Sequence, residues 1–153
     1  MSQVVRSPVA GVVVALDDVP DPVFSGRIVG PGVAVIPDRA GGDDVSALAP
    51  ISGTVSKIHP HAYVITHDDG RSFLVHLGLD TVSLAGAGFT VHASEGAALE
   101  AGDPVISFSP DRIEAEGLSP VVPVVALDAG ESDLVLAPPG TALSPKMTAF
   151  TWA

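Results

Sequence analysis

Glycine and proline interrupt this chain so often that few long helices can form. The 153 residues include 16 Gly and 14 Pro, which together make up about 20% of the chain where about 12% is typical. Gly loses the most backbone entropy in a helix, and Pro removes a hydrogen-bond donor. Hydrophobic residues still make up 46% of the chain, which is enough to form a folded core. We therefore expect a folded domain with very little helix.

Short runs rich in Val and Ile alternate with turns of Gly, Pro and Asp. The strands that these runs predict lie at residues 11–16, 32–36, 53–58, 62–66, 72–76 and 104–108. Such spacing, with turn signals between the runs, is typical of an all-β sandwich or barrel. The best helical candidate is a short turn at residues 111–116, which follows Pro110.

Two segments near the start of the chain are similar to each other. Residues 8–16 and 50–58 both read Pro, an apolar residue, a small residue and Gly, followed by a run of strand type. The similarity indicates either an internal duplication or a chance recurrence of Pro-x-x-Gly turns. Residues 38–46 predict a surface loop. After Leu127 the pattern loses its period, so we expect one domain at 1–127 and an extension at 128–153 that forms an edge strand plus a tail.

Charge and cysteine content exclude several classes of function. The chain has 7 Lys and Arg against 18 Asp and Glu, a formal net charge of −11, and no Cys. Such a polyanion is a poor binder of nucleic acid or anionic lipid. Without Cys there is no disulfide, no Cys-ligated zinc and no thiol nucleophile. No apolar run approaches the ~20 residues of a membrane helix, so we expect a cytoplasmic protein without membrane insertion.

A predicted hairpin brings two histidines together. Asp69-Gly70 between two strand-like runs is a strong signal for a two-residue loop. That loop pairs Tyr63 with His76 and His61 with Gly78, and the missing side chain of Gly78 leaves room beside both rings. The side chains that then share one face are those of His61, Tyr63, Leu74 and His76.

Two imidazoles on one face suit two chemistries. They can bind a metal ion, because neutral His is a common zinc ligand. They can also transfer a phosphoryl group, with one neutral nitrogen attacking phosphorus and the second ring donating a hydrogen bond to the anionic oxygens. A purely structural pair of histidines is the third interpretation, and the spacing alone leaves all three open.

The residues around His76 resemble the signature of a known family. Residues 75–82 read Val-His-Leu-Gly-Leu-Asp-Thr-Val, and residues 86–89 read Gly-Ala-Gly-Phe. Further matching segments, in the same order as in the family, lie at 18–24, 28–30 with Gly32, 49–53, 95–96, 101–106 and 119–122. Over about residues 5–127, the chain resembles the glucose-family enzyme IIA (EIIA) proteins of the bacterial phosphoenolpyruvate-dependent sugar phosphotransferase system.

The resemblance implies an antiparallel β-sandwich that relays a phosphoryl group. His76 is then the residue phosphorylated by the phosphocarrier protein HPr, and it passes the group to a IIB domain of a sugar permease. His61 supports the phosphoryl group. No cofactor is implied, apart from a zinc ion at His61 and His76 in the presence of a partner. The residues that fit the partner-binding surface are the apolar Val23, Phe24, Val29 and Val82 and the acidic Asp21 and Asp80.

Two alternatives have support from individual residues. A zinc metallohydrolase is one, because His59-Pro60-His61 is a His-x-His pair and residues 73–77 resemble the catalytic histidine segment of LytM-type endopeptidases. Those enzymes need an upstream His, and none precedes His59. A non-catalytic carrier domain is the other, although Lys146-Met147 matches only part of the Met-Lys-Met hairpin of such carriers. His59 also stands where the EIIA family often has a Thr.

Overall fold

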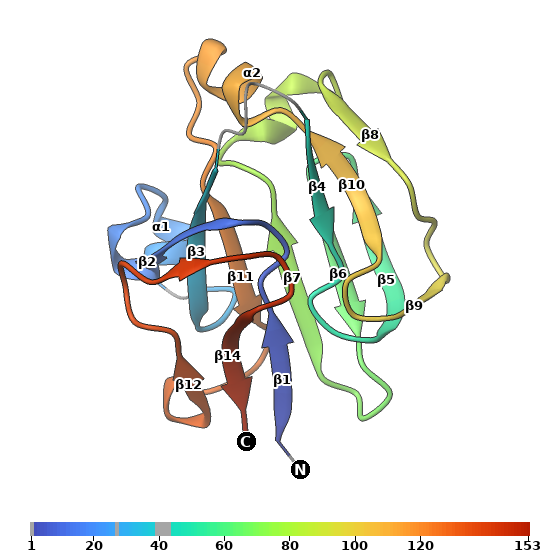
Figure 1. Ribbon diagram of the computed structural model, residues 1–153, viewed down its shortest axis with the longest axis vertical. Helices are drawn as coiled ribbons and strands as arrows, with labels where there is room; N and C mark the ends of the chain where they lie inside the picture. Colours follow the sequence, from blue (N-terminus) through green and yellow to red (C-terminus); the bar gives the residue numbers. More distant parts are fainter. Residues whose placement is uncertain (1, 27, 39–43) are drawn as a thin grey trace.

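The fold consists of three antiparallel sheets that pack around a central core. The computed structural model describes residues 2–26, 28–38 and 44–153. The largest sheet has eight strands in the order β13-β2-β3-β11-β7-β6-β5-β9, and two three-stranded sheets have the orders β1-β14-β12 and β4-β10-β8 (Figure 1). The strands are β1 (Gln3–Arg6), β2 (Gly11–Ala15), β3 (Gly32–Pro37), β4 (Val45–Leu48), β5 (Gly53–His59), β6 (Ala62–Thr66), β7 (Ser72–His76), β8 (Phe89–Val91), β9 (Ala98–Leu99), β10 (Pro104–Phe108), β11 (Val122–Ala126), β12 (Leu134–Leu136), β13 (Ala142–Leu143) and β14 (Thr148–Trp152).

Helical structure within the described residues is limited to short segments. These are α1 (Pro22–Ser25), α2 (Pro110–Ala115) and the 3₁₀ turns η1 (Leu16–Asp18), η2 (Thr81–Leu84) and η3 (Glu131–Asp133). Helix α2 confirms the helical turn expected after Pro110. It begins at Pro110 itself, because the hydroxyl of Ser109 accepts a hydrogen bond from the Arg112 amide at 3.2 Å and caps the helix.

The expected strands are confirmed with small shifts of their ends. The strands expected at 62–66, 72–76 and 104–108 have those bounds as β6, β7 and β10. The surface loop expected at 38–46 is wrong at its end, since Val45 and Ser46 belong to β4 and pair with β10. Residues 39–43 of that loop lie outside the described residues.

The eight-stranded sheet buries apolar side chains on both faces of its middle strands. Successive residues of a strand point to opposite faces, and in β11 Val124 joins the main core while Val125 joins a second cluster. The main core includes Phe73, Phe108 and Phe150. The second cluster consists of Leu16, Val19, Phe24, Ala34, Leu79, Val121 and Val125. It lies under the face of β7 that carries His76, because Leu74, two residues before His76, packs against it.

The strand order is nearly symmetric about the β11–β7 pair. Strands β1, β2 and β3 occupy the same relative positions as β4, β5 and β6, and strands β11 to β14 occupy those of β7 to β10. The two small sheets repeat the same arrangement: β14 lies between β1 and β12 as β10 lies between β4 and β8. Two halves of similar topology therefore build the fold.

Backbone hydrogen bonds repeat in the same way. The Arg6 amide donates to the Pro50 carbonyl at 2.8 Å, and the Leu48 amide donates to the Pro8 carbonyl at 3.0 Å. These reciprocal bonds join the two similar Pro-x-x-Gly segments. The reciprocity favours the internal duplication over the chance recurrence of turns.

The last residues of the chain are built into the fold. Residues 128–153 contribute three strands, and β14 lies in the middle of its sheet, with Ala149 and Phe150 buried. The edge strands among the three are β12 and β13. Figure 1 shows β14 beside β1, so that the two chain ends lie together. The domain division at residue 127 stays a prediction.

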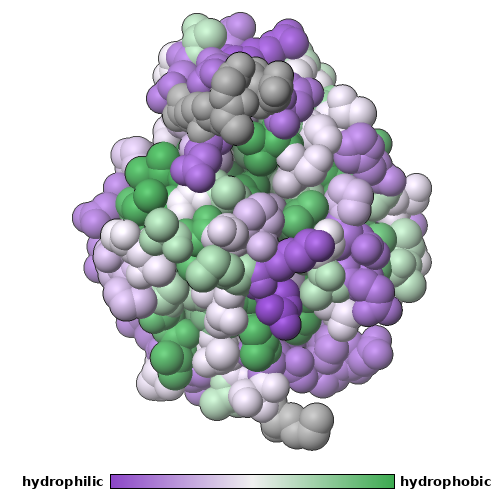
Figure 2. Space-filling model, in the orientation of Figure 1, coloured by the Kyte–Doolittle hydropathy of each residue, from purple (hydrophilic) through white to green (hydrophobic). Residues whose placement is uncertain are grey.

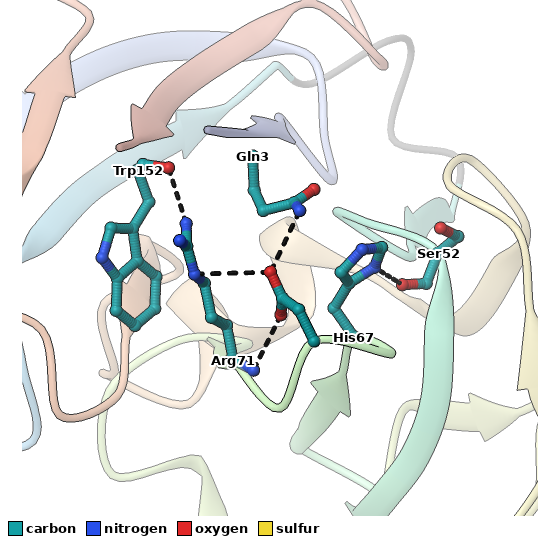
Figure 3. Close-up of polar contacts among 6 residues, drawn as sticks. Gln3, Ser52, His67, Arg71 and Trp152 are labelled. Carbon is teal, nitrogen blue, oxygen red and sulfur yellow. Dashed lines mark hydrogen bonds and ion pairs between the residues drawn. The ribbon is translucent and has the colours of Figure 1, made fainter. Parts of the chain in front are cut away.

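A polar cluster fastens the β6–β7 turn to both terminal strands (Figure 3). The Arg71 guanidinium donates to the Trp152 carbonyl at 2.7 Å and lies 4.9 Å from the centre of the indole ring. The Asp69 carboxylate accepts a hydrogen bond from the Gln3 amide at 3.0 Å and lies 3.4 Å from the Arg71 Nε. The hairpin that carries His76 is thereby held against β1 and β14.

The surface seen in the orientation of Figure 1 is mixed in polarity. Figure 2 shows hydrophilic side chains concentrated at the upper end, around α2, and at the lower right, with separate hydrophobic patches between them. Among the described residues, none of the helices has the length and apolar character to cross a membrane.

Candidate functional site

The β6–β7 hairpin has a three-residue loop rather than the expected two-residue loop. The His67 amide donates to the Arg71 carbonyl at 2.8 Å, and the Gly70 amide donates to the His67 carbonyl at 2.9 Å. Gly70 has φ +93°, which a glycine reaches without a steric penalty. His67 Nδ1 also donates to the Ser52 carbonyl at 2.7 Å (Figure 3). The longer loop shifts the register by one residue, so that Ala62 lies opposite His76.

The register shift moves Tyr63 to the other face of the sheet. Tyr63 pairs with Val75 and is only 1% exposed, and its hydroxyl donates to the Leu48 carbonyl at 2.7 Å. Burial raises the pKa of Tyr63 well above its ordinary value. The expectation that Tyr63 shares a face with His76 is therefore wrong, although Leu74 and His76 do share one.

The two histidines meet by a different route. His59 pairs with Ala62, so Pro60 and His61 form the tight turn between β5 and β6. This turn places the His61 ring against the His76 ring, with centroids 5.2 Å apart and planes inclined by 70°. The ring of His59 stacks on the ring of His61, with centroids 5.8 Å apart and planes inclined by 21°. His59 is solvent-exposed, as a histidine next to a turn is expected to be, and it also contacts the ring of His61.

A backbone carbonyl fixes the tautomer of His76. His76 Nδ1 lies 2.5 Å from the carbonyl oxygen of Gly78. A carbonyl can only accept, so Nδ1 carries the proton and Nε2 keeps its lone pair. Gly78 has φ +82°, and a Cβ there would lie 2.6 Å from Thr81 Cγ2. The space that Gly78 provides is therefore filled by Thr81 and not, as expected, left beside the two rings.

Both histidines are neutral at neutral pH. Burial lowers the pKa of His76 below 6.5, and the bond to Gly78 and the charges of Asp21 and Asp80 offset part of this effect. Burial also lowers the pKa of His61, and the neighbouring His76 and His59 lower it further. A neutral His76 with a free Nε2 lone pair is a competent nucleophile.

The predicted site residues line one hollow with a volume of about 360 Å³. Its lining consists of Asp21, Val23, Phe24, Val29, His61, Leu74, His76, Asp80 and Val82. Val23 and Val82 are 41% and 66% exposed and form part of its rim. Phe24 is expected on the rim but is buried, with only 4% of its surface exposed. Its ring contacts that of His76 edge to face, with centroids 5.3 Å apart. Phe24 therefore supports the ring of His76 from below.

The two acidic residues begin the short helical segments that border the hollow. Asp21 caps α1, because its carboxylate accepts a hydrogen bond from the Val23 amide at 2.9 Å. Asp80 precedes η2 with φ +58°, and its side chain makes no capping bond. Asp21 thus has the local turn role that its residue type predicts, while both carboxylates also act electrostatically on His76.

The metal-binding capacity of the hollow is small. Over the part of the chain that the structure describes, there is no group of three or more His, Cys, Asp or Glu placed to hold a metal ion. His61 and His76 offer two imidazoles, whereas zinc in proteins takes four ligands. These two rings alone leave the coordination of a zinc ion incomplete, so its other ligands would have to come from outside this pair, as water or from a partner.

Comparisons with known proteins give a consistent result. Residues 3–131 match the family described as phosphoenolpyruvate-dependent sugar phosphotransferase system, EIIA 1. The chain is similar to the "PTS system beta-glucoside-specific EIIBCA component" of Bacillus subtilis (strain 168), with 40% identity over 125 residues, which cover 80% of this chain and 20% of that relative. This chain therefore corresponds to only a small part of that longer protein.

A solved structure extends the comparison to the fold. The chain is similar to the glucose permease IIA from Mycoplasma capricolum, with a TM-score of 0.87 and 29% identity, over 99% of this chain and 96% of that one. The likeness confirms the antiparallel β-sandwich with little helix that was expected from the sequence.

Proposed function

The chain belongs to the EIIA 1 family and is a phosphoryl-transfer component of a phosphoenolpyruvate-dependent sugar phosphotransferase system, and from this we propose that His76 is its phosphoryl acceptor and His61 its phosphoryl support. The observation that carries the proposal is the bond from His76 Nδ1 to the Gly78 carbonyl. It leaves the Nε2 lone pair available for attack.

The transfer from HPr exchanges one P–N bond for another. The donor is the phosphohistidine of HPr. Its P–N bond breaks, and the electron pair of that bond returns to the donor nitrogen. Nε2 of His76 supplies the pair for the new P–N bond, while the proton stays on Nδ1 and the Gly78 carbonyl stabilises the charge that develops on the ring. In the onward transfer the P–N bond of His76 breaks, its electron pair returns to Nε2, and a cysteine thiolate of the IIB domain supplies the pair for the new P–S bond. Positioning of the rings then contributes most of the catalysis, because the transition state of phosphoryl transfer is loose.

His61 lies where it can support the transferred group. Its ring meets His76 edge to face at 5.2 Å, and both rings line the same hollow. A neutral imidazole has one N–H to donate, and the phosphoryl oxygens are strong acceptors. We therefore assign His61 to stabilise the phosphoryl group on His76 and to assist its onward transfer to a IIB domain of a sugar permease.

The rim of the hollow fits the docking of both partners. Exposed Val23 and Val82 border the histidines, and Asp21 and Asp80 stand beside them. Apolar contact supplies affinity there, and the two carboxylates together with the net charge of −11 favour the approach of a basic partner. In this proposal HPr and the IIB domain use the same hollow in turn, in the cytoplasm.

Phosphorylation of the isolated protein tests the site. The protein is incubated with phosphoenolpyruvate, enzyme I and HPr, and the peptide from Arg71 to Phe89 is analysed by mass spectrometry. We expect one acid-labile phosphate on His76, no phosphate on the His76→Ala variant, and normal phosphorylation of His92→Ala, whose histidine lies outside the hollow. Acid-labile phosphate on His76→Ala would show that another residue is the acceptor.

The same preparation tests the two alternatives named from the sequence. A LytM-like zinc metallohydrolase requires stoichiometric zinc in the isolated protein, and a non-catalytic carrier domain requires no phosphoryl acceptance at all. We expect acceptance of phosphate without bound zinc. Stoichiometric zinc together with a lack of phosphorylation would contradict the phosphoryl relay.

A further inference from the structure

A third histidine ring, that of His59, lies next to the two histidines of the proposed relay and stacks on His61. We propose that His59 is a positioning residue, which holds the His61 ring by stacking and so keeps it in place for onward phosphoryl transfer. This inference rests on the proposed function, since it concerns the step that His61 assists. His59 is an exposed residue at the end of β5, outside the lining of the hollow.

The local backbone sets the two rings face to face. His59 and Ala62 form the last pair of the β5–β6 hairpin, and Pro60 and His61 make its turn. Pro60 has a fixed φ, which limits how the turn can move. The ring of His59 then lies nearly parallel to that of His61, at 21° and 5.8 Å. Such an offset stack is one of the preferred arrangements of aromatic pairs.

His61 depends on this stack because it has no other anchor of its own. His76 is fixed by its bond to the Gly78 carbonyl and by the edge of Phe24. Neither ring nitrogen of His61 has a hydrogen-bond partner among the described residues, and its ring contacts there are with His59 and His76. Without His59, one face of the His61 ring is open to solvent, and its side-chain torsions are free to change.

His59 acts through His61 and not on the phosphoryl group directly. Within the described part of the chain, His59 makes a ring contact with His61 and none with His76. The flat ring is therefore what matters, and a phenyl ring can replace it, whereas a hydrogen bond or a charge is not required. This separates a positioning role from a catalytic one.

Transfer kinetics of three variants test the role. His59→Ala, His59→Phe and the control Thr54→Ala, on an exposed residue of the same strand, are phosphorylated by HPr and then mixed with a IIB domain. An aromatic pair of this kind corresponds to about a threefold to tenfold effect on a rate. We expect His59→Ala to lower kcat for onward transfer by that factor, with KM and acceptance from HPr unchanged. His59→Phe and Thr54→Ala should stay within about twofold of the parent.

A nuclear magnetic resonance measurement reports on the stack without any phosphoryl transfer. The ring protons of His61 should lose their ring-current shift in His59→Ala and keep most of it in His59→Phe. Parent-like onward transfer by His59→Ala, or a His59→Phe variant as slow as His59→Ala, overturns the inference. Failure of the parent protein to accept phosphate overturns the proposed function instead, and the ring-current shift then still shows whether the stack exists.

Discussion

The rings of His61 and His76 meet edge to face, 5.2 Å apart, although the two residues are not cross-strand partners in the β6–β7 hairpin. His76 stands opposite Ala62, and His61 reaches it from the turn that precedes β6. The pairing therefore depends on two turns, one at each end of β6. A change in either turn would move one ring away from the other, so the local backbone sets the geometry of the relay.

Replacement of His61 should separate the two halves of the relay. His61→Gln retains an amide N–H but removes the imidazole ring that places the donor at the phosphoryl group, so the positioned donor is lost. We expect His76 to accept phosphate from HPr at a rate close to that of the parent, and onward transfer to a IIB domain to slow by about 10²-fold, the scale of a lost positioned donor. Rapid-quench measurement of both steps checks this, and equal onward rates would remove the role assigned to His61.

The protonation of the two histidines should follow their burial. Because the pKa of His76 and that of His61 are both lowered, each titration midpoint in a nuclear magnetic resonance experiment should lie below 6.5. As the pH falls, the two histidines take up protons in the unfolded chain before they do so in the folded chain. The stability that depends on the two rings being neutral is therefore complete above pH 6.5 and is lost progressively below it. Urea unfolding at several pH values should show this decrease, and a midpoint above 6.5 for either ring contradicts the prediction.

Substitution of Gly78 should disturb the site through its backbone. Gly78→Ala places a Cβ 2.6 Å from Thr81 Cγ2 at φ +82°, and it displaces the carbonyl that holds His76 Nδ1. Gly70→Ala is the matched control, because Gly70 has φ +93° but no atom within 4 Å of its Cβ position. We expect Gly70→Ala to lower the free energy of unfolding by about 1 kcal/mol from backbone strain alone.

The difference between the two glycine variants measures the local clash. Gly78→Ala should lose about 1–2 kcal/mol more than Gly70→Ala, and it alone should slow phosphoryl acceptance by His76. Denaturant unfolding and the HPr assay give the two quantities. Equal effects of the two variants on acceptance would mean that the Gly78 carbonyl does not control the tautomer of His76.

The internal duplication predicts a stabilising substitution. Lys146 has φ +73° and occupies the position that Gly102, at φ +93°, occupies in the other half. Lys146→Gly should therefore raise the free energy of unfolding by about 0.5–1 kcal/mol. Lys146→Ala is the control, since it removes the same side chain but keeps a Cβ at positive φ, and it should give no such gain. The bond from Arg6 to the Lys146 carbonyl is available to both variants.

The apolar rim can be tested with two exposed valines. Val82 borders the hollow at 66% exposure, and Val135 lies on β12 at 73% exposure. Val82→Ser and Val135→Ser should each change the free energy of unfolding by less than about 0.5 kcal/mol. Only Val82→Ser should raise KM for HPr, by about fivefold to tenfold, because it removes apolar area that a partner buries. A parent-like KM for Val82→Ser would place docking elsewhere.

Local signals were sufficient for most of the architecture. The runs of Val and Ile between Gly and Pro predicted β6, β7 and β10 with their observed ends, because alternating burial and turn residues act over a few positions. The end of the chain was harder to interpret. Strand β14 has no clear period, and its place between β1 and β12 depends on partners far away in the sequence.

The sequence by itself determined the all-β class, the two histidines fifteen residues apart and the motif around His76 that carries the family resemblance. Only the tertiary structure decided the register that buries Tyr63, the carbonyl that leaves Nε2 of His76 free, and the stacking of His59 on His61. Residue type and spacing record which groups are present and which local turns they favour. Side-chain facing depends on loop length to a single residue, and the choice between a two-residue and a three-residue loop is made by the packing of the whole hairpin.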